Sequence, residues 1–408
     1  MHRAVRGAAR WTTAAATCVV ILGLPYTGTA SAATAAACGA TATPAPTVSD
    51  PAAVPWAVAA SGVDGLAGVA DGAGETVAVI DSGVAPLATF GHRVLHGHDL
   101  LGSTDGRTDC VGHGTAVASI IAAAPANGIG FRGLAPVAKI LPVRVTEAEL
   151  VGTVASGDAT TAAGLGDAIT WAVDHGADVL NISVVVGTDD RTLRTAVARA
   201  IDKGVVVVAS VGNSHSDSGP DPTPYPAAYP GVIGVGSIDS TGQRSSTSEV
   251  GNFLDVVAPG GGVTADRVPS GLGAFDGTSF AVPYVAATAA LIRQEFPGLG
   301  PDQVAARIFA TTDRPPIGAS PTDYGHGIVD PYRAVAGALP GTDVAAPLSS
   351  STTSPPHVAG GRVTGPAAGI ENPGRQRSIV AVTAAIALIM LAFGWTLTAA
   401  HRRRLDQL

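Results

Sequence analysis

The sequence of 408 residues is poor in charged and aromatic side chains, which make up only 14% and 4% of it. Lysine is nearly absent, because Lys139 and Lys203 are the only two and the other basic residues are arginines. The central part of the chain carries no basic stripe, and the formal net charge is -8. Nucleic acid is bound through clustered positive charge, so these features argue against a nucleic-acid partner.

Cysteine is scarce as well, with only Cys18, Cys38 and Cys110 in the whole chain. Two or three cysteines without CxxC spacing do not suit zinc, and the acidic residues are scattered, so we predict no metal site and no cofactor. If Cys18 is removed with an export signal, the remaining pair, Cys38 and Cys110, most simply forms one disulfide in an exported protein. Such a cross-link would contribute on the order of 4 kcal/mol of stability.

The N-terminus has the pattern of an export signal. Arginines at positions 3, 6 and 10 precede a short apolar stretch over 12–24, and Ala-Ser-Ala at 30–32 offers a cleavage site. The alternative, a membrane anchor, needs about 20 apolar residues, and this stretch is shorter. We therefore predict a signal peptide over residues 1–32.

The C-terminal part differs, because residues 379–400 form a run without any charged side chain. As a helix this run would extend about 33 Å, which matches the apolar thickness of a bilayer. The sequence predicts a transmembrane helix over 378–400 after a linker rich in Pro, Ser and Gly over 340–377. The basic cluster that follows places the tail, 401–408, in the cytoplasm, so the chain is predicted to be a single-pass type I protein of the cell membrane.

Between these ends, apolar strands alternate with helices. Because the strands are apolar on both faces, we expect a doubly wound, mostly parallel α/β sheet with helices on both faces, over residues 75–339. Residues 33–74 read as an extension lying over this domain, and residues 147–166 as a loop with no clear structure. Strands are predicted at 75–80, 138–145, 178–186, 205–210, 227–239 and 254–259, and helices at 113–124, 164–175 and 189–202 and from 279 and 301.

Ser279 follows a Gly-Thr pair and opens a long apolar helix. Backbone N–H groups at a helix N-terminus favour negative charge, which a nucleophile that passes through an oxyanion requires. The alternative for Ser279 taken alone is a simple N-cap.

Three more polar residues stand at predicted strand ends or helix starts. Asp81 follows the apolar strand and could orient a base, although Asp-Ser-Gly is also a common turn. His113 lies between two glycines, which leave room for a substrate, or it is a capping histidine. Asn213 follows another apolar strand and could donate to an oxyanion, or it is a turn asparagine. In a parallel sheet all of these ends meet at one edge, where ligands bind.

These residues lie in motifs that resemble those of the subtilases, the subtilisin-type serine proteases. The chain order Asp, His, Ser is the subtilase order. The resemblance covers about residues 75–336. The matching segments are VIDSGV at 79–84, GHGT at 112–115, VASVGN at 208–213 and GTSFAVP at 277–283.

The resemblance implies a serine endopeptidase with a role for each residue. Ser279 would be the nucleophile, His113 the general base, and Asp81 the residue that orients the imidazole. Asn213 and the Ser279 N–H would form the oxyanion hole. Asn181 and Ser183 lie in the segment 181–184, which resembles the strand that pairs with the substrate backbone. The sequence departs from the commoner pattern at residues 184–186, where three valines replace a Leu-Gly-Gly type sequence.

The overall arrangement resembles the mycosins, membrane-anchored subtilases of actinobacterial type VII secretion systems. This resemblance implies exported protein or peptide substrates and components of the secretion membrane complex as partners, and it implies that a disulfide, here Cys38 with Cys110, holds the extension. Two alternatives are a mainly structural subunit of that complex and a surface-tethered degradative subtilisin. The extension over 33–74 could also be a cleaved propeptide, although it is short for one.

Overall fold

The computed structural model describes residues 45–147, 149–151, 154–156 and 159–338 of the chain. Its main sheet has seven strands in the order β2-β3-β1-β6-β7-β8-β9, and every neighbouring pair is parallel. These strands are β1 (Thr76–Asp81), β2 (His98–Asp99), β3 (Lys139–Arg144), β6 (Val179–Ile182), β7 (Val206–Ser210), β8 (Val232–Ile238) and β9 (Val256–Pro259).

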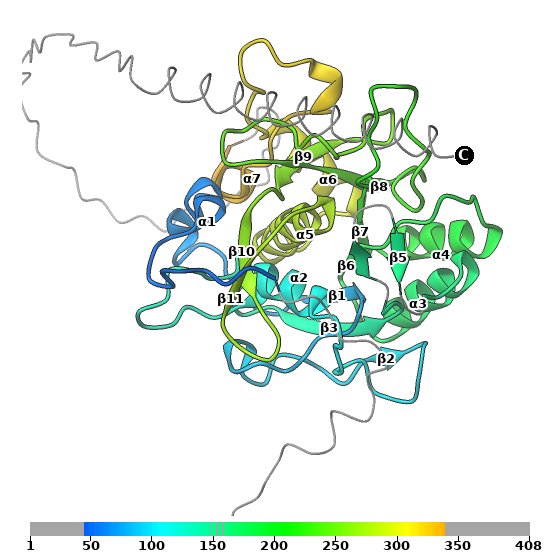
Figure 1. Cartoon of the computed structure of the whole chain (residues 1–408), viewed down its shortest axis with the longest axis horizontal. Helices are drawn as coiled ribbons and strands as arrows, with labels where there is room; N and C mark the ends of the chain where they lie inside the picture. The colour runs from blue at the N-terminus through cyan, green and yellow to red at the C-terminus, as the bar shows by residue number, and fades with distance from the viewer. Residues whose placement is uncertain (1–44, 148, 152–153, 157–158, 339–408) are drawn as a thin grey trace, which may run out of the picture. The chain divides into compact units, whose positions relative to one another are not determined.

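Strand β1 shows why the sheet is covered on both faces. All six of its residues are buried, and its side chains alternate between two apolar clusters. Val77 and Val79 belong to the cluster that contains α2 and α5, whereas Ala78 and Ile80 belong to the cluster that contains α3 and α4. Figure 1 shows the two helix pairs on opposite sides of the sheet. The predicted parallel sheet with helices on both faces is therefore confirmed.

The helices begin at positions that supply caps or tolerate special backbone geometry. For α4, the Asp190 carboxylate accepts hydrogen bonds from the backbone N–H groups of Thr192 and Leu193 at 2.8 and 3.0 Å. The α-helices are α1 (Trp56–Ala60), α2 (His113–Ala122), α3 (Ala162–Asp174), α4 (Arg191–Asp202), α5 (Thr278–Glu295), α6 (Pro301–Ala310) and α7 (Pro331–Ala336). The short 3-10 helices are η1 (Val63–Leu66), η2 (Ala88–Phe90) and η3 (Pro321–Asp323).

One expectation about local structure is wrong. Residues 147–166 are not without structure, because they contain an antiparallel pair of strands, β4 (Glu149–Val151) and β5 (Val154–Ser156), and the start of α3. The Thr161 side chain accepts from the Gly164 N–H and caps that helix, which begins at Ala162, two residues earlier than predicted. A second antiparallel pair, β10 (Val263–Asp266) with β11 (Leu272–Phe275), was also not predicted, since both strands are short.

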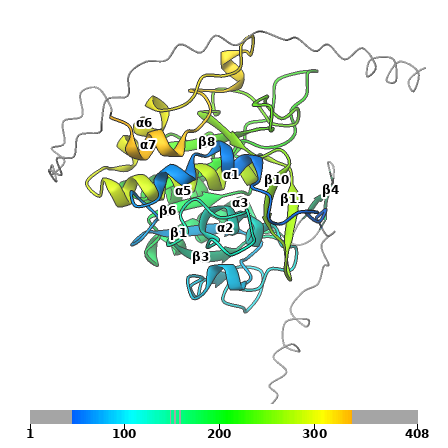
Figure 2. The same cartoon turned by 90° about the vertical axis from the view of Figure 1, so that its left-hand side faces the viewer.

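The described part of the extension packs against the α/β domain. Ala57 and Val58 of α1 and Leu66 of η1 are buried in the same apolar cluster as α5, and Figure 2 shows α1 on the side of the domain where α5 and α7 lie. Removing residues 45–74 would therefore expose part of the core.

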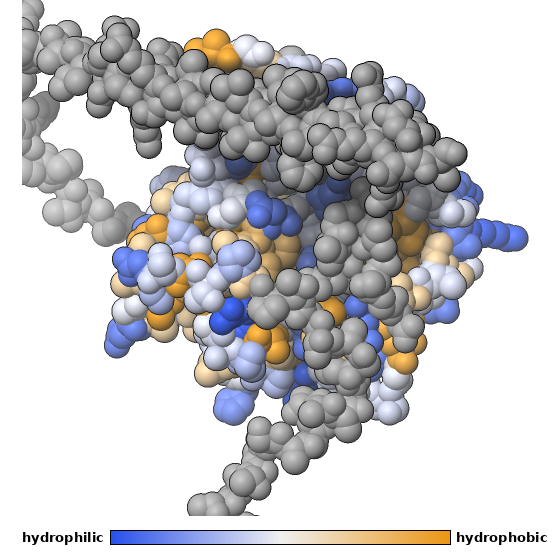
Figure 3. Space-filling model, viewed as in Figure 1, coloured by the Kyte–Doolittle hydropathy of each residue, from blue (hydrophilic) through white to orange (hydrophobic). Residues whose placement is uncertain are grey.

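On the face visible in Figure 3, hydrophobic residues are scattered among hydrophilic ones.

None of the described helices combines the length and apolar character that a membrane crossing requires. The predicted signal peptide (1–32), Cys38, the linker from residue 340, the transmembrane helix (378–400) and the tail lie outside the described residues. These assignments stay predictions.

Candidate active site

Three neighbouring strands bring polar residues to the same edge of the sheet. In the register of the sheet, Ile80 of β1 pairs with Ile182 of β6, and Ile182 pairs with Ala209 of β7. Asp81 and Ser183, which follow the first two, therefore lie side by side at the carboxyl edge. The strand order also reverses here, because β3 and β2 lie on one side of β1 and β6 to β9 on the other. Such a reversal opens a crevice at this edge of a doubly wound sheet.

His113 lies beside Asp81 at the start of α2. The His113 Nδ1 and Asp81 Oδ1 atoms are 2.7 Å apart, and the Ser82 N–H donates to the same oxygen at 2.6 Å. A carboxylate only accepts, so Nδ1 carries the proton. The Asp81 side chain is 1% exposed and that of His113 34% exposed. The Asp81 carboxylate is thus buried, while the His113 imidazole is partly exposed to solvent.

Ser279 is the second residue of α5, and its neighbour Phe280 contacts the His113 ring, with ring centroids 4.9 Å apart. The Ser279 hydroxyl donates to the Ser183 carbonyl at 3.3 Å. Pro283 has no N–H, so it cannot donate to the Ser279 carbonyl four residues earlier in the helix. The Ser183 hydroxyl donates to that carbonyl instead, at 3.2 Å. Ser279 is therefore held from both its side chain and its backbone.

Asn213 is oriented by a residue that the sequence did not indicate. Its Oδ1 accepts from the Thr278 N–H at 2.8 Å and from the Thr278 hydroxyl at 3.0 Å. The Thr278 hydroxyl also lies 2.6 Å from the Ser210 hydroxyl. Because the carbonyl end of the amide is occupied, its NH2 end is the one that can donate to a bound group. The Gly-Thr pair before the serine was the available signal for this contact.

The two residues predicted to bind substrate, Asn181 and Ser183, are both buried. Asn181 is fully buried, and its amide donates to the Ser183 hydroxyl at 3.0 Å. Further along, Val186 and Tyr225 exchange backbone hydrogen bonds of 2.9 Å in both directions. The segment after β6 is thus held in an extended form by its neighbour, with Val185 36% exposed.

Beneath His113 lies a second buried carboxylate, Asp109, that the sequence did not indicate. It accepts from the N–H groups of Gly112 and Thr115 at 2.7 and 2.8 Å, so it caps α2 in place of Gly112. It also accepts from the hydroxyls of Thr115 and Ser82, at 2.5 and 2.9 Å. Burial raises the pKa of Asp109, and the nearby charge of Asp81 raises it further, although the hydrogen bonds from Thr115 and Ser82 oppose this.

We expect Asp109→Asn to lower the free energy of unfolding by roughly 3 kcal/mol, because an amide NH2 would face the Thr115 N–H and leave it without an acceptor. Urea unfolding of the full chain measures this change. The control is Asp64→Asn, which affects an exposed ion pair with Arg132 and should change stability by less than about 1 kcal/mol. Equal stabilities of the two variants would contradict a capping role for Asp109.

The described residues include Cys110, which is disulfide-bonded. The other two cysteines of the chain, Cys18 and Cys38, lie outside the described residues. The pairing of Cys38 with Cys110 therefore stays a prediction.

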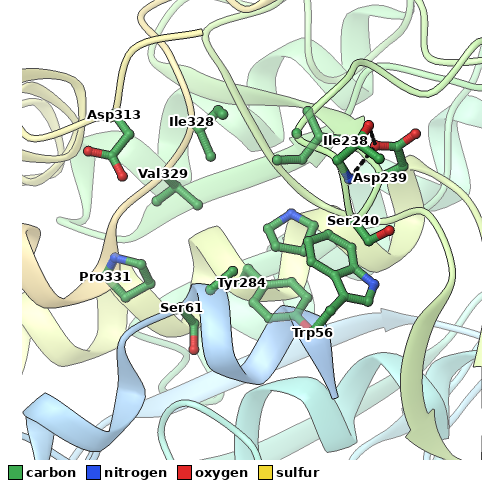
Figure 4. Close-up of a pocket in the computed structure, with 14 residues that line it drawn as sticks. Trp56, Ser61, Ile238, Asp239, Ser240, Tyr284, Asp313, Ile328, Val329 and Pro331 are labelled. Atoms are coloured by element: carbon green, nitrogen blue, oxygen red, sulfur yellow. Dashed lines mark hydrogen bonds between the residues drawn. The ribbon is translucent and has the colours of Figure 1, made fainter. Parts of the chain in front are cut away.

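A cavity of about 290 Å³ lies away from these residues, between the extension and the catalytic domain. Figure 4 shows Trp56 and Ser61 of the extension facing Asp239, Tyr284 and Pro331 across it. None of the predicted catalytic residues lines this cavity. The predicted catalytic residues lie elsewhere, with Asp81 at the carboxyl edge of the sheet and His113 and Ser279 at the starts of α2 and α5.

A doubly wound parallel sheet with Asp81 bonded to His113 at its carboxyl edge and Ser279 at the start of α5 is the arrangement of the subtilisin-like class of serine proteases. The Subtilase family (Peptidase_S8) matches residues 72–327, and the chain belongs to this family.

Similar proteins include mycosins. Mycosin-4 of Mycobacterium tuberculosis is 36% identical over 81% of this chain and 78% of its own length. The crystal structure of MycP1 from the ESX-1 type VII secretion system has a TM-score of 0.64 and 31% identity, covering 74% of this chain and 91% of that one. A chain of the intact ESX-5 inner membrane complex has a TM-score of 0.64 and 27% identity, covering 88% of this chain and 94% of its own. The expected likeness to mycosins is confirmed.

Proposed function

We propose that this protein is an active serine endopeptidase that uses Ser279 as nucleophile, His113 as general base and Asp81 to orient the imidazole. The hydrogen bond between His113 and the buried Asp81 carries the proposal, because it leaves Nε2 as the basic nitrogen. The contact between the His113 ring and Phe280 supports it, since Phe280 follows the nucleophile. The three residues can then work as one unit.

The reaction follows from these roles. The Ser279 hydroxyl attacks the peptide carbonyl carbon while His113 Nε2 takes the hydroxyl proton. The negative oxygen that develops accepts hydrogen bonds from the Asn213 side-chain NH2 and the Ser279 N–H at the start of α5. His113 then donates its proton to the amine that leaves, and a water molecule releases the acyl group by the same steps in reverse. An extended substrate would pair with the backbone of residues 183–185, since Val186 already pairs with Tyr225.

We further propose that the chain works at the cell membrane as part of a type VII secretion complex. The likeness to MycP1 and to a chain of the ESX-5 inner membrane complex supports this. In this proposal the signal peptide (1–32) exports the domain, the helix over 378–400 anchors it, and a disulfide between Cys38 and Cys110 ties down the extension. Its substrates would be exported proteins or peptides. A mainly structural role in such a complex is the second candidate, and the same likeness supports it.

The test is to label the full chain, solubilised in detergent, with a fluorophosphonate probe. We expect a covalent adduct on Ser279, located by mass spectrometry of the digested protein, because the probe reacts only with an activated serine. Heat-unfolded protein is the control and should remain unlabelled. An adduct on another serine would contradict Ser279 as the nucleophile. No adduct on folded protein would contradict the enzyme proposal and favour the structural role.

A further inference from the structure

The backbone around Asn213 is held by a buried glutamate from a distant part of the chain. The Glu249 N–H donates to the carbonyl of Gly212 at 3.2 Å, and the Glu249 carboxylate accepts from the Ser214 N–H at 3.0 Å. These are the residues immediately before and after Asn213. The backbone and side chain of Glu249 therefore bond to the residues on both sides of Asn213.

Gly212 shows how closely the carboxylate approaches. Its φ of 102° lies in the region that favours glycine, and a Cβ atom there would come within 2.4 Å of the nearer Glu249 carboxylate oxygen. The carboxylate thus packs directly against the Gly212 backbone. Any larger residue at position 212 would displace it.

A second acidic residue ties the rest of this loop to the same segment. Asp221 accepts from the His215 ring and from the Val250 N–H, each at 2.7 Å, and from the Ser216 N–H at 3.2 Å. Val250 follows Glu249 directly. Both acidic residues therefore fasten the loop after Asn213 to residues 249–250.

Stability alone does not account for a carboxylate at position 249. Glu249 is 3% exposed, and its second oxygen has no hydrogen-bond partner among the described residues. Burial raises the pKa of Glu249, and the charge of Asp221 raises it further, while the Ser214 N–H and His215 lower it. Burying such a group costs free energy that an apolar side chain of the same size would avoid.

We propose that Glu249 is a positioning residue for the oxyanion hole. Thr278 holds the side-chain carbonyl of Asn213, and Glu249 holds the backbone on either side of it. Together they direct the NH2 group toward the oxygen that becomes negative. This inference rests on the proposed oxyanion role of Asn213.

The experiment compares Glu249→Met with Glu249→Gln in the full chain, using a peptide substrate. The Met and Gln side chains have similar lengths, but only Gln retains an acceptor for the Ser214 N–H. A shift of about 1 Å at a catalytic group lowers turnover up to about 10²-fold, so we expect Glu249→Met to lower kcat about 10- to 100-fold. KM should change less than about twofold, because Asn213 acts mainly in the transition state. Glu249→Gln should recover most of kcat.

Two further variants separate positioning from general loss of stability. Asp255→Ala removes a half-buried carboxylate, one that accepts from the Gly234 N–H, and should leave kcat unchanged. Asn213→Ala should lower kcat about 10²- to 10³-fold, and adding Glu249→Met to it should lower kcat no further. All rates refer to the folded fraction. Glu249→Ala replaces Glu249→Met in the comparison if the latter does not fold.

The outcomes distinguish the inference from the proposed function. If Glu249→Met lowers kcat equally with and without Asn213, or if Glu249→Met keeps the wild-type kcat, the positioning role is overturned while the enzyme proposal stands. If Asn213→Ala itself retains the wild-type kcat, the oxyanion role of Asn213 fails and the inference fails with it.

Discussion

Replacing Ser279 by alanine is expected to lower kcat for peptide hydrolysis about 10⁶-fold, as for the serine of a working triad. Without the hydroxyl, the His113–Asp81 pair has no nucleophile to activate, and only binding and the oxyanion donors remain to assist water. The fold should persist, because the hydroxyl makes one 3.3 Å hydrogen bond to the Ser183 carbonyl. We expect the free energy of unfolding to change by no more than about 1 kcal/mol.

The rate is measured with a peptide substrate on the full chain. The matched control is Ser240→Ala, because Ser240 lines the separate cavity beneath the extension. That variant should keep the wild-type kcat. If Ser279→Ala retained measurable turnover near that of the wild type, the proposed nucleophile would be wrong.

Asp81→Asn is expected to lower kcat about 10⁴-fold with little change in KM. An asparagine side chain can donate its N–H to His113 Nδ1, which would move the ring proton to Nε2. A protonated Nε2 cannot take the proton of Ser279. The positions of the site residues would remain the same, but His113 could no longer activate Ser279.

The chain supplies a close control for this variant. The Asp105 carboxylate lies 2.7 Å from His96 Nδ1, the same distance as in the Asp81–His113 pair, but the His96 side chain is 77% exposed. Asp105→Asn should leave kcat unchanged, since that pair lies at the surface. Similar losses in both variants would indicate a general effect of removing a carboxylate rather than a triad.

The sequence indicated most of the sheet and much of the candidate site. Asp81 and Asn213 follow strands that are apolar on both faces, and His113 and Ser279 begin helices, so their places could be predicted from local patterns. The prediction of an unstructured loop over 147–166 was wrong, because β4 and β5 are too short to show periodicity.

Thr278 and Glu249 were not predicted because their roles depend on partners far along the chain. Asp109 differs, because it caps α2 through Gly112 and Thr115, which are only three and six residues away. Thr278 contacts Asn213 across 65 residues, and Glu249 contacts Ser214 across 35. Thr278 lies in the GTSFAVP motif, but neither that motif nor a single glutamate specifies which distant residue the side chain will contact. Only folding brings these pairs together.

By itself, therefore, the amino-acid sequence determined the alternating strands and helices and the chemical groups at their ends, because periodicity and local motifs are properties of neighbouring residues. The tertiary structure alone decided which buried polar groups hold those ends in place. It placed Ser183 against the Ser279 carbonyl that Pro283 leaves without a helical donor, and Glu249 against the backbone around Asn213. A buried hydrogen bond depends on three-dimensional distance, which sequence spacing does not encode.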